Sequence, residues 1–153
     1  MKLICSQNFK LRSTQSIHDI CLAGDYIVIF ESSISLSLKK LVISKAFLNS
    51  LVFDESLPVL MHIYKKEDLS FVKTIETEPF FIFHFTNGYS TDKKIVVEYA
   101  RYNAKDASTF FNLIEHIPNY GVNSEKEYNF SSVMEEVNID LETMKFTFIN
   151  REQ

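Results

Sequence analysis

Short apolar runs separated by polar turns recur along the chain, a pattern typical of a β-rich protein. Runs rich in β-branched and aromatic side chains predict strands at residues 17–22, 26–31, 59–64, 71–75, 80–85 and 95–102. Residues 23–25, Ala-Gly-Asp, fit a tight hairpin between the first two strands. Residues 138–146 predict a strand, a turn and another strand. No linker or low-complexity tract divides the sequence, so residues 1–153 are expected to form one mainly β domain.

Two segments carry helical spacing instead. Between residues 36 and 53, apolar side chains recur at roughly helical intervals, namely Leu38, Leu41, Val42, Leu48 and Val52. We expect this short amphipathic helix to contact a core with its apolar face. The alternative is contact with a membrane surface, which suits the nearby Lys39, Lys40 and Lys45. Those lysines interrupt the run and exclude a membrane span. A second helix is predicted at residues 104–117, with His116 near its end.

Charge and cysteine content narrow the expected partners and compartment. Lys and Arg number 16 and Asp and Glu 20, so the net charge of −4 argues against nucleic acid as a partner. Cys5 and Cys21 are the two cysteines, and the first residues are too short an apolar run for a secretory signal. Reduced thiols in the cytoplasm are therefore expected. The 14 Phe and 7 Tyr fit either a packed β core or the wall of a tunnel for an apolar ligand.

One histidine stands inside the most aromatic of these runs. His84 lies in the segment Glu78-Pro79-Phe80-Phe81-Ile82-Phe83-His84-Phe85-Thr86-Asn87-Gly88-Tyr89, which is predicted to be a buried strand. Burying an imidazole among phenylalanines costs free energy unless both ring nitrogens have partners. His84 is therefore expected either to be hydrogen-bonded in the core or to bind a ligand such as a metal ion.

The order of residues around His84 resembles a motif of the carotenoid cleavage oxygenase family. The shared pattern is Phe83-His84, two residues, Asn87, a small residue and an aromatic one, followed by a strand. A second segment, His18-Asp19 followed by an apolar strand, resembles another motif of that family and lies 66 positions upstream (84 minus 18). The resemblance implies that His18 and His84 are iron ligands. Two departures are Ile20 in place of Phe and Ser90 in place of an acidic residue.

The same resemblance implies a fold and a reaction. The family fold is a seven-bladed β-propeller with short helical insertions, and at roughly 40 to 50 residues per blade this chain supplies about two to three blades from its middle section. Family members hold non-haem Fe(II) with four histidines and cleave a carotenoid or apocarotenoid double bond with dioxygen. Neither His62 nor His116 lies in a matching motif, so both are expected to be structural.

Three functions remain open from the sequence. The chain can be a piece of an oxygenase whose missing blades come from a complementary chain. It can be a non-catalytic remnant or interaction module that has lost half of its metal site. It can also be a binder of small apolar ligands that uses the aromatic surface. The resemblance further implies contact with a membrane surface, so the expected location is cytoplasmic and peripheral to a membrane.

Overall fold

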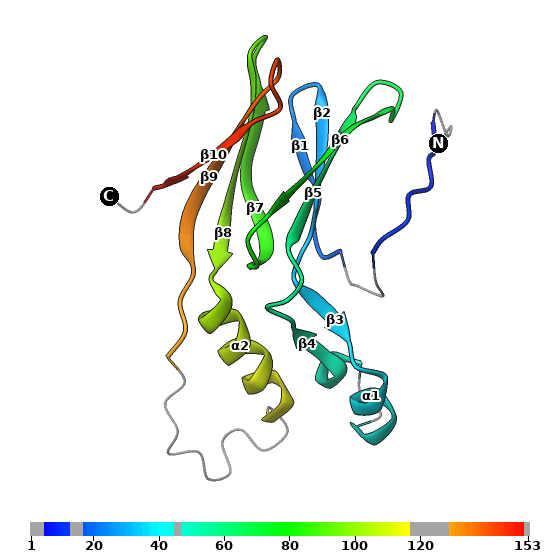
Figure 1. Cartoon of the computed structure of the whole chain (residues 1–153), viewed down its shortest axis with the longest axis vertical. Coiled ribbons are helices and arrows are strands. Elements are labelled where there is room, and N and C mark those ends of the chain that lie inside the picture. Colours follow the sequence, from blue (N-terminus) through cyan, green and yellow to red (C-terminus); the bar gives the residue numbers. More distant parts are fainter. Residues whose placement is uncertain (1–4, 13–16, 45–46, 117–128, 152–153) are drawn as a thin grey trace.

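The strands form two four-stranded antiparallel sheets and one small hairpin (Figure 1). The computed structural model describes residues 5–12, 17–44, 47–116 and 129–151. The first sheet has the order β1(Cys21–Ala23), β2(Tyr26–Glu31), β5(Val59–Lys65), β6(Phe71–Thr77). The second has the order β7(Phe81–Ser90), β8(Lys94–Tyr102), β9(Val133–Asp140), β10(Phe146–Asn150). Each sheet is an antiparallel meander, interrupted in the first sheet by an insertion between β2 and β5, and this is the arrangement of a propeller blade.

The predicted strands agree with the observed ones in position and differ mainly in length. β2 has the predicted bounds, and β5, β6 and β8 extend the predicted strands by one or two residues. β7 continues to Ser90, well beyond the predicted end at residue 85. β1 begins only at Cys21, so His18 precedes the strand instead of lying within it. The mainly β prediction is confirmed, with two blade-like sheets in the described residues.

An insertion between β2 and β5 contains the short helix predicted between residues 36 and 53. It consists of β3(Ile34–Leu36), α1(Leu38–Ser44), the 3-10 turn η1(Leu48–Ser50) and β4(Leu51–Phe53). The helix is short because β3 and β4 pair with each other, and ladder hydrogen bonds satisfy the backbone that a longer helix would have used. Ser37 caps α1, its hydroxyl accepting from the backbone N–H of Lys40 at 3.3 Å.

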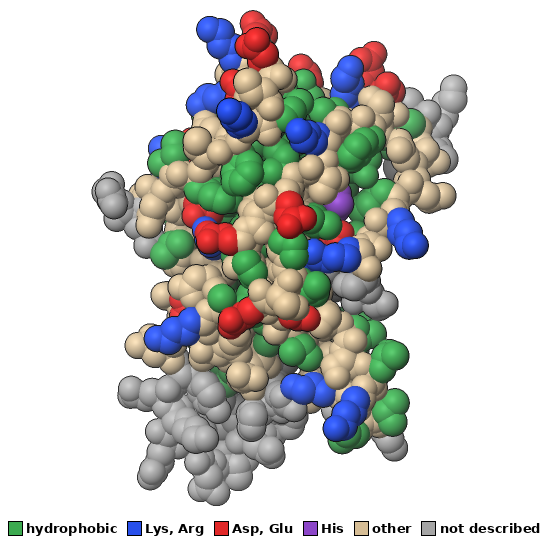
Figure 2. All heavy atoms as spheres, viewed as in Figure 1, with side chains coloured by type: hydrophobic (Ala, Val, Ile, Leu, Met, Phe, Trp, Pro, Cys, Tyr) green, Lys and Arg blue, Asp and Glu red, His purple; other side chains and the backbone are tan. Residues whose placement is uncertain are grey.

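The apolar face of α1 does not contact the core, so that expectation is wrong. Leu38 is 70% and Val42 76% exposed, and Ile43 next to them is equally open. Figure 2 shows apolar side chains beside lysines at this end of the molecule. No helix within the described residues has the length and apolar character to cross a membrane.

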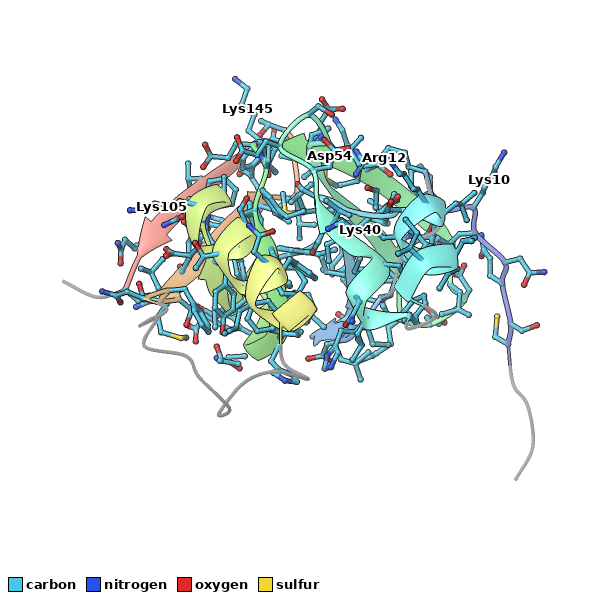
Figure 3. All side chains as sticks on the ribbon, turned by 90° about the horizontal axis from the view of Figure 1, so that it is seen from below. Lys10, Arg12, Lys40, Asp54, Lys105 and Lys145 are labelled. Atoms are coloured by element: carbon cyan, nitrogen blue, oxygen red, sulfur yellow. The ribbon has the colours of Figure 1, made fainter. Side chains whose placement is uncertain are left out.

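The second insertion joins β8 to β9 and begins with α2(Ala104–His116). Asn103 caps this helix, since its side-chain oxygen accepts from the Asp106 N–H at 3.0 Å and its amide donates to the Asp106 carboxylate at 2.7 Å. α1 and α2 lie at the same end of the molecule, and Lys40 points from α1 into the space between them (Figure 3). Lys40, Phe53, Phe111 and Asn112 line a cavity of about 160 Å³ there.

The main core lies between the inner faces of the two four-stranded sheets. Its fully buried members include Val28, Met61 and Ile63 from the first sheet and Ile95 and Val97 from the second. The first strands of the two sheets, β1 and β7, approach each other most closely at Gly88, where a β-carbon would stand 3.3 Å from the Ala23 β-carbon. The two sheets therefore pack face to face and meet at β1 and β7.

A second, aromatic core holds α2 and the β3–β4 hairpin against the start of β7. Its buried members are Ile34, Leu51, Phe53, Phe81, Ala107 and Phe111. Phe81 contacts Phe83 at a ring-centroid distance of 4.4 Å and Phe111 at 5.0 Å. This cluster ends beside Phe83, the residue before His84, and so lies next to the predicted metal ligands.

Candidate metal centre

His18 and His84 are in contact where β1 of the first sheet meets β7 of the second, a boundary that we call the seam. Their ring centroids are 4.8 Å apart and their planes meet at 81°. His18 belongs to the segment that leads into β1, and His84 lies on β7. Two histidines that are 66 positions apart in the sequence are thus neighbours in the fold, as a shared site requires.

A β-bulge sets the direction of the His84 side chain. Ile82 pairs with Arg101 and Phe85 with Tyr99, so Phe83 and His84 together oppose the single residue Ala100. A bulge bends its strand and turns the side chains of the extra residues. Here the His84 side chain is exposed to solvent, and its neighbours Phe83 and Phe85 are half-buried.

The expectation that His84 is buried is wrong. Its side chain is 67% exposed, and His18 is also exposed. The aromatic run predicts burial correctly for Phe81 and Ile82. The bulge that follows them changes the direction of the next side chains, and His84 points to solvent. The two rings therefore border solvent, and a metal ion or ligand can reach them without any rearrangement of the core.

Hydrogen bonding leaves one nitrogen of His18 available. Its Nδ1 lies 3.2 Å from the backbone oxygen of Phe83. A carbonyl oxygen only accepts, so Nδ1 carries the proton and Nε2 carries the lone pair. This is the tautomer in which a neutral imidazole binds a metal through Nε2, with its other nitrogen anchored to a backbone carbonyl.

Asp19 stands beside the other ring. Its Oδ2 lies 3.8 Å from His84 Nδ1 and accepts from the Phe85 N–H at 3.1 Å. Two neighbouring side chains also contact the backbone of β7. His18 Nδ1 lies 3.2 Å from the Phe83 oxygen, and the Cys21 thiol lies 3.8 Å from the Asn87 oxygen.

The donor set fits two ligands of a transition-metal ion. Neutral imidazole suits divalent iron, cobalt, nickel, copper and zinc, and the two exposed rings are neighbours with centroids 4.8 Å apart. Among the described residues, no group of three or more His, Cys, Asp or Glu side chains is placed to hold a metal ion. The chain therefore offers two histidine ligands, and further ligands would have to be supplied from elsewhere.

His62 is a structural histidine, as expected. It is buried in β5, with Nδ1 2.8 Å from the Thr74 hydroxyl and Nε2 3.1 Å from Glu31 Oε2. Glu31 is fully buried and also accepts from the backbone N–H of Arg12 at 2.8 Å. Both ring nitrogens of His62 are occupied by protein groups, so neither is open to a metal. α2 ends at His116, whose side chain lies outside the described part of the structure.

An aromatic wall leads away from the two histidines. Phe83 contacts the His18 ring at 5.4 Å and the Phe110 ring at 5.1 Å, both nearly edge to face. Phe110 in turn contacts Tyr102 and Phe130 at 6.2 and 5.5 Å. The high aromatic content of the sequence is compatible with such an aromatic surface but does not identify its members. The rings near the two histidines are set by the packing of α2 against β7 and β8.

Comparison with known proteins identifies related molecules. The family model described as retinal pigment epithelial membrane protein, RPE65, matches residues 2–151. No curated protein sequence matches the chain.

Several solved structures share the fold. The chain is 13% identical to cobalt-substituted apocarotenoid oxygenase (ACO) from Synechocystis, with a TM-score of 0.60. It is 16% identical to an ACO/RPE65 chimera, with a TM-score of 0.66. Each match covers 88% of this chain and 27% of the other, so the chain spans about a quarter of the length of these structures.

Proposed function

The chain belongs to the family of the retinal pigment epithelial membrane protein, RPE65, and on that premise we propose that it supplies two ligands of a non-haem Fe(II) centre. The centre would cleave a double bond of a carotenoid or apocarotenoid with dioxygen. The observation that carries this proposal is the contact between His18 and His84, whose ring centroids lie 4.8 Å apart at the seam between the two sheets. Bound iron would supply a site for activating dioxygen next to the polyene.

Within this proposal the protein residues hold and orient the reacting groups. The Phe83 carbonyl keeps the proton of His18 on Nδ1 and so leaves Nε2 free to bind. The wall of Phe83, Phe110 and Tyr102 would bind the apolar chain of the substrate, because aromatic side chains offer large apolar contact area. The same wall would exclude water from one side of the site.

Metal binding tests the proposal directly. Untagged protein is loaded with Fe(II) without oxygen, desalted, and measured for iron per chain. We expect iron to be retained by the wild type and to fall to background in His18→Ala and His84→Ala, because one remaining imidazole binds weakly. His116→Ala is the matched control and should retain the wild-type content. Equal iron in all four proteins would contradict the proposal.

Binding of an apolar ligand without metal is the second candidate function. The incomplete ligand set among the described residues favours it, together with the aromatic wall that ends at Phe83. Metal-free wild type that quenches or shifts the spectrum of an apocarotenoid would support this function. Phe110→Ala should then weaken binding, whereas His18→Ala should leave it unchanged.

A complementary chain would complete the oxygenase. Ile20 and Leu22, beside the site, are 49% and 59% exposed, which leaves apolar surface for another blade to cover. Co-expression with a segment of the family that carries the remaining histidines tests this. A stable complex that retains more iron than either part alone would support it, and two chains that separate on gel filtration would contradict it.

A membrane surface is the proposed location of the substrate. α1 presents Leu38, Val42 and Ile43 to solvent beside the exposed Lys39, which suits an interface rich in anionic lipid. Sedimentation with vesicles containing anionic lipid should capture the wild type and lose Val42→Asp. Ile149→Asp, an exposed apolar position on β10, is the control and should still sediment. The cytoplasmic location of the chain stays a prediction.

A further inference from the structure

We propose that Asp19 is a positioning residue for His84, fixing which ring nitrogen of that histidine carries the proton and where the ring points. This inference deepens the proposed metal centre and rests on it. It assigns to the His-Asp pair at positions 18 and 19 a double role, in which the histidine is a ligand and the aspartate orients the other ligand across the seam.

The Asp19 carboxylate is held in place by two backbone groups. Oδ1 accepts from the Ile20 N–H at 2.8 Å, and Oδ2 accepts from the Phe85 N–H at 3.1 Å. Its side chain is 35% exposed, and both of its oxygens are hydrogen-bonded to backbone N–H groups. One of these braces comes from its own segment and the other from β7. The carboxylate therefore moves with the strand that carries His84.

His84 Nδ1 lies 3.8 Å from the same Oδ2, which is within ion-pair range and just beyond hydrogen-bond range. The ring is largely exposed, so a small side-chain rotation closes this gap without displacing buried atoms. A carboxylate oxygen only accepts, and so it selects the tautomer with the proton on Nδ1. Nε2 then carries the lone pair.

The two histidines are thus oriented by equivalent means. His18 places its Nδ1 proton on the Phe83 oxygen at 3.2 Å, and His84 turns its Nδ1 toward the Asp19 carboxylate. Residues 83 and 85 are backbone partners for residues 18 and 19, with His84 between them on the bulge. The same contacts that join the two sheets therefore leave the lone pair on Nε2 in both rings.

The test compares Asp19→Ala with Asp19→Asn and Ser90→Ala. Asp19→Ala removes the acceptor. Asp19→Asn keeps one oxygen that can face the Phe85 N–H and His84, while the exposed Ile20 N–H turns to water. Ser90→Ala is the structural control, because it removes another hydrogen bond across the same seam, the one from the Asp25 N–H at 3.2 Å, without touching His84.

The first readout is the His84 tautomer in metal-free protein, measured by nitrogen-15 NMR at a pH where the ring is neutral. We expect the Nδ1-protonated form to dominate in the wild type, Asp19→Asn and Ser90→Ala, and to lose its dominance in Asp19→Ala. The second readout is cobalt(II) affinity, which should fall about 10- to 100-fold in Asp19→Ala, the usual effect of removing such a partner. Asp19→Asn should fall less, and Ser90→Ala should stay at the wild-type value.

The two readouts separate this proposal from the one it rests on. If the wild type binds no metal but the tautomer changes in Asp19→Ala, the metal centre fails while the Asp19–His84 relationship stands. If Asp19→Ala alters neither the tautomer nor the cobalt affinity relative to Ser90→Ala, Asp19 only joins the two strands and the positioning role is overturned.

Discussion

Gly88 of β7 lies so close to Cys21 of β1 that a β-carbon at position 88 would overlap the cysteine sulfur. The backbone oxygen of Leu22 and the β-carbon of Ala23 would both lie 3.3 Å from it. This contact sets how closely the two sheets approach each other, and it lies on the same pair of elements as His18 and His84. A residue without a side chain is required there for steric reasons, since only Gly24 among the described glycines has a positive φ.

Replacing this glycine should therefore separate the sheets. We expect Gly88→Ala to lower the free energy of unfolding by about 1–3 kcal/mol, the usual cost of overfilling a packed contact. Urea-induced unfolding measures the change. Because the sulfur is the nearest atom, the additional change Cys21→Ala should recover part of the loss. Simple additivity of the two single changes would contradict this account of the seam.

The buried pair Glu31 and His62 should be important for stability. Glu31 is fully buried and its partners are His62 and Arg12. Glu31→Ala should cost about 3–5 kcal/mol, because it leaves the buried imidazole without its partner. Glu31→Gln should cost less, since an amide can still bond to both neighbours. Thermal unfolding ranks the variants, and an equal loss in both would show that the negative charge of the carboxylate matters more than side-chain volume or hydrogen-bonding capacity.

Replacing Arg101 should lower the free energy of unfolding. Its guanidinium donates to Glu135 at 2.9 Å and to Glu78 at 2.5 Å while lying 4.7 Å from the centre of the Phe80 ring. Arg101→Lys should lower the free energy of unfolding by about 1–3 kcal/mol, because an ammonium group cannot form the same fork. Arg101→Met should cost more, by leaving the Glu135 carboxylate with only the Tyr99 hydroxyl at 2.6 Å.

Adding Glu135→Gln provides the control for that prediction. Once the buried carboxylate is neutral, the further change Arg101→Met should cost less than it does in the wild type. A cost that stays the same would mean that the arginine acts through its contact with Phe80 instead of its ion pair.

The two cysteines should differ in reactivity. Burial, together with the smaller effect of the negative charge of Asp19, raises the pKa of the Cys21 thiol to about 11. Because the thiolate is the reactive form, Cys21 should resist alkylation at pH 8, while exposed Cys5 reacts. Mass spectrometry of iodoacetamide-treated native protein distinguishes the two sites. Rapid modification of Cys21 at pH 8 would show that the seam opens in solution.

The same shift has a consequence for stability. The unfolded thiol loses its proton near its ordinary pKa of 9.0, whereas the folded one keeps it until about pH 11. The unfolded state binds fewer protons in that window, so the contribution of Cys21 to stability should fall as pH rises from about 9 to 11. Cys21→Ala should remove this part of the pH dependence.

Local sequence patterns predicted the strands well where a run rich in β-branched and aromatic residues was bounded by polar turns. The predicted bounds of β2, β5 and β8 agree closely with the observed ones. Each of these strands buries apolar side chains, and only one pairing register keeps those side chains in the core. Within residues 36–53 a short helix was predicted and is present at Leu38–Ser44, but the pairing of Ile34–Leu36 with Leu51–Phe53 around it was not predicted. Pairing between residues so far apart leaves no mark on local periodicity.

The sequence by itself determined which residues belong to the candidate site and which fold carries them. The motifs around His18 and His84, their order and their spacing resemble those of the carotenoid cleavage oxygenase family, and that resemblance implied both. Only the tertiary structure decided that the two rings meet 4.8 Å apart, that His84 is exposed and that Asp19 stands beside it. Those facts depend on a bulge in β7 and on the close approach of two sheets at Gly88, which arise when distant strands pack together.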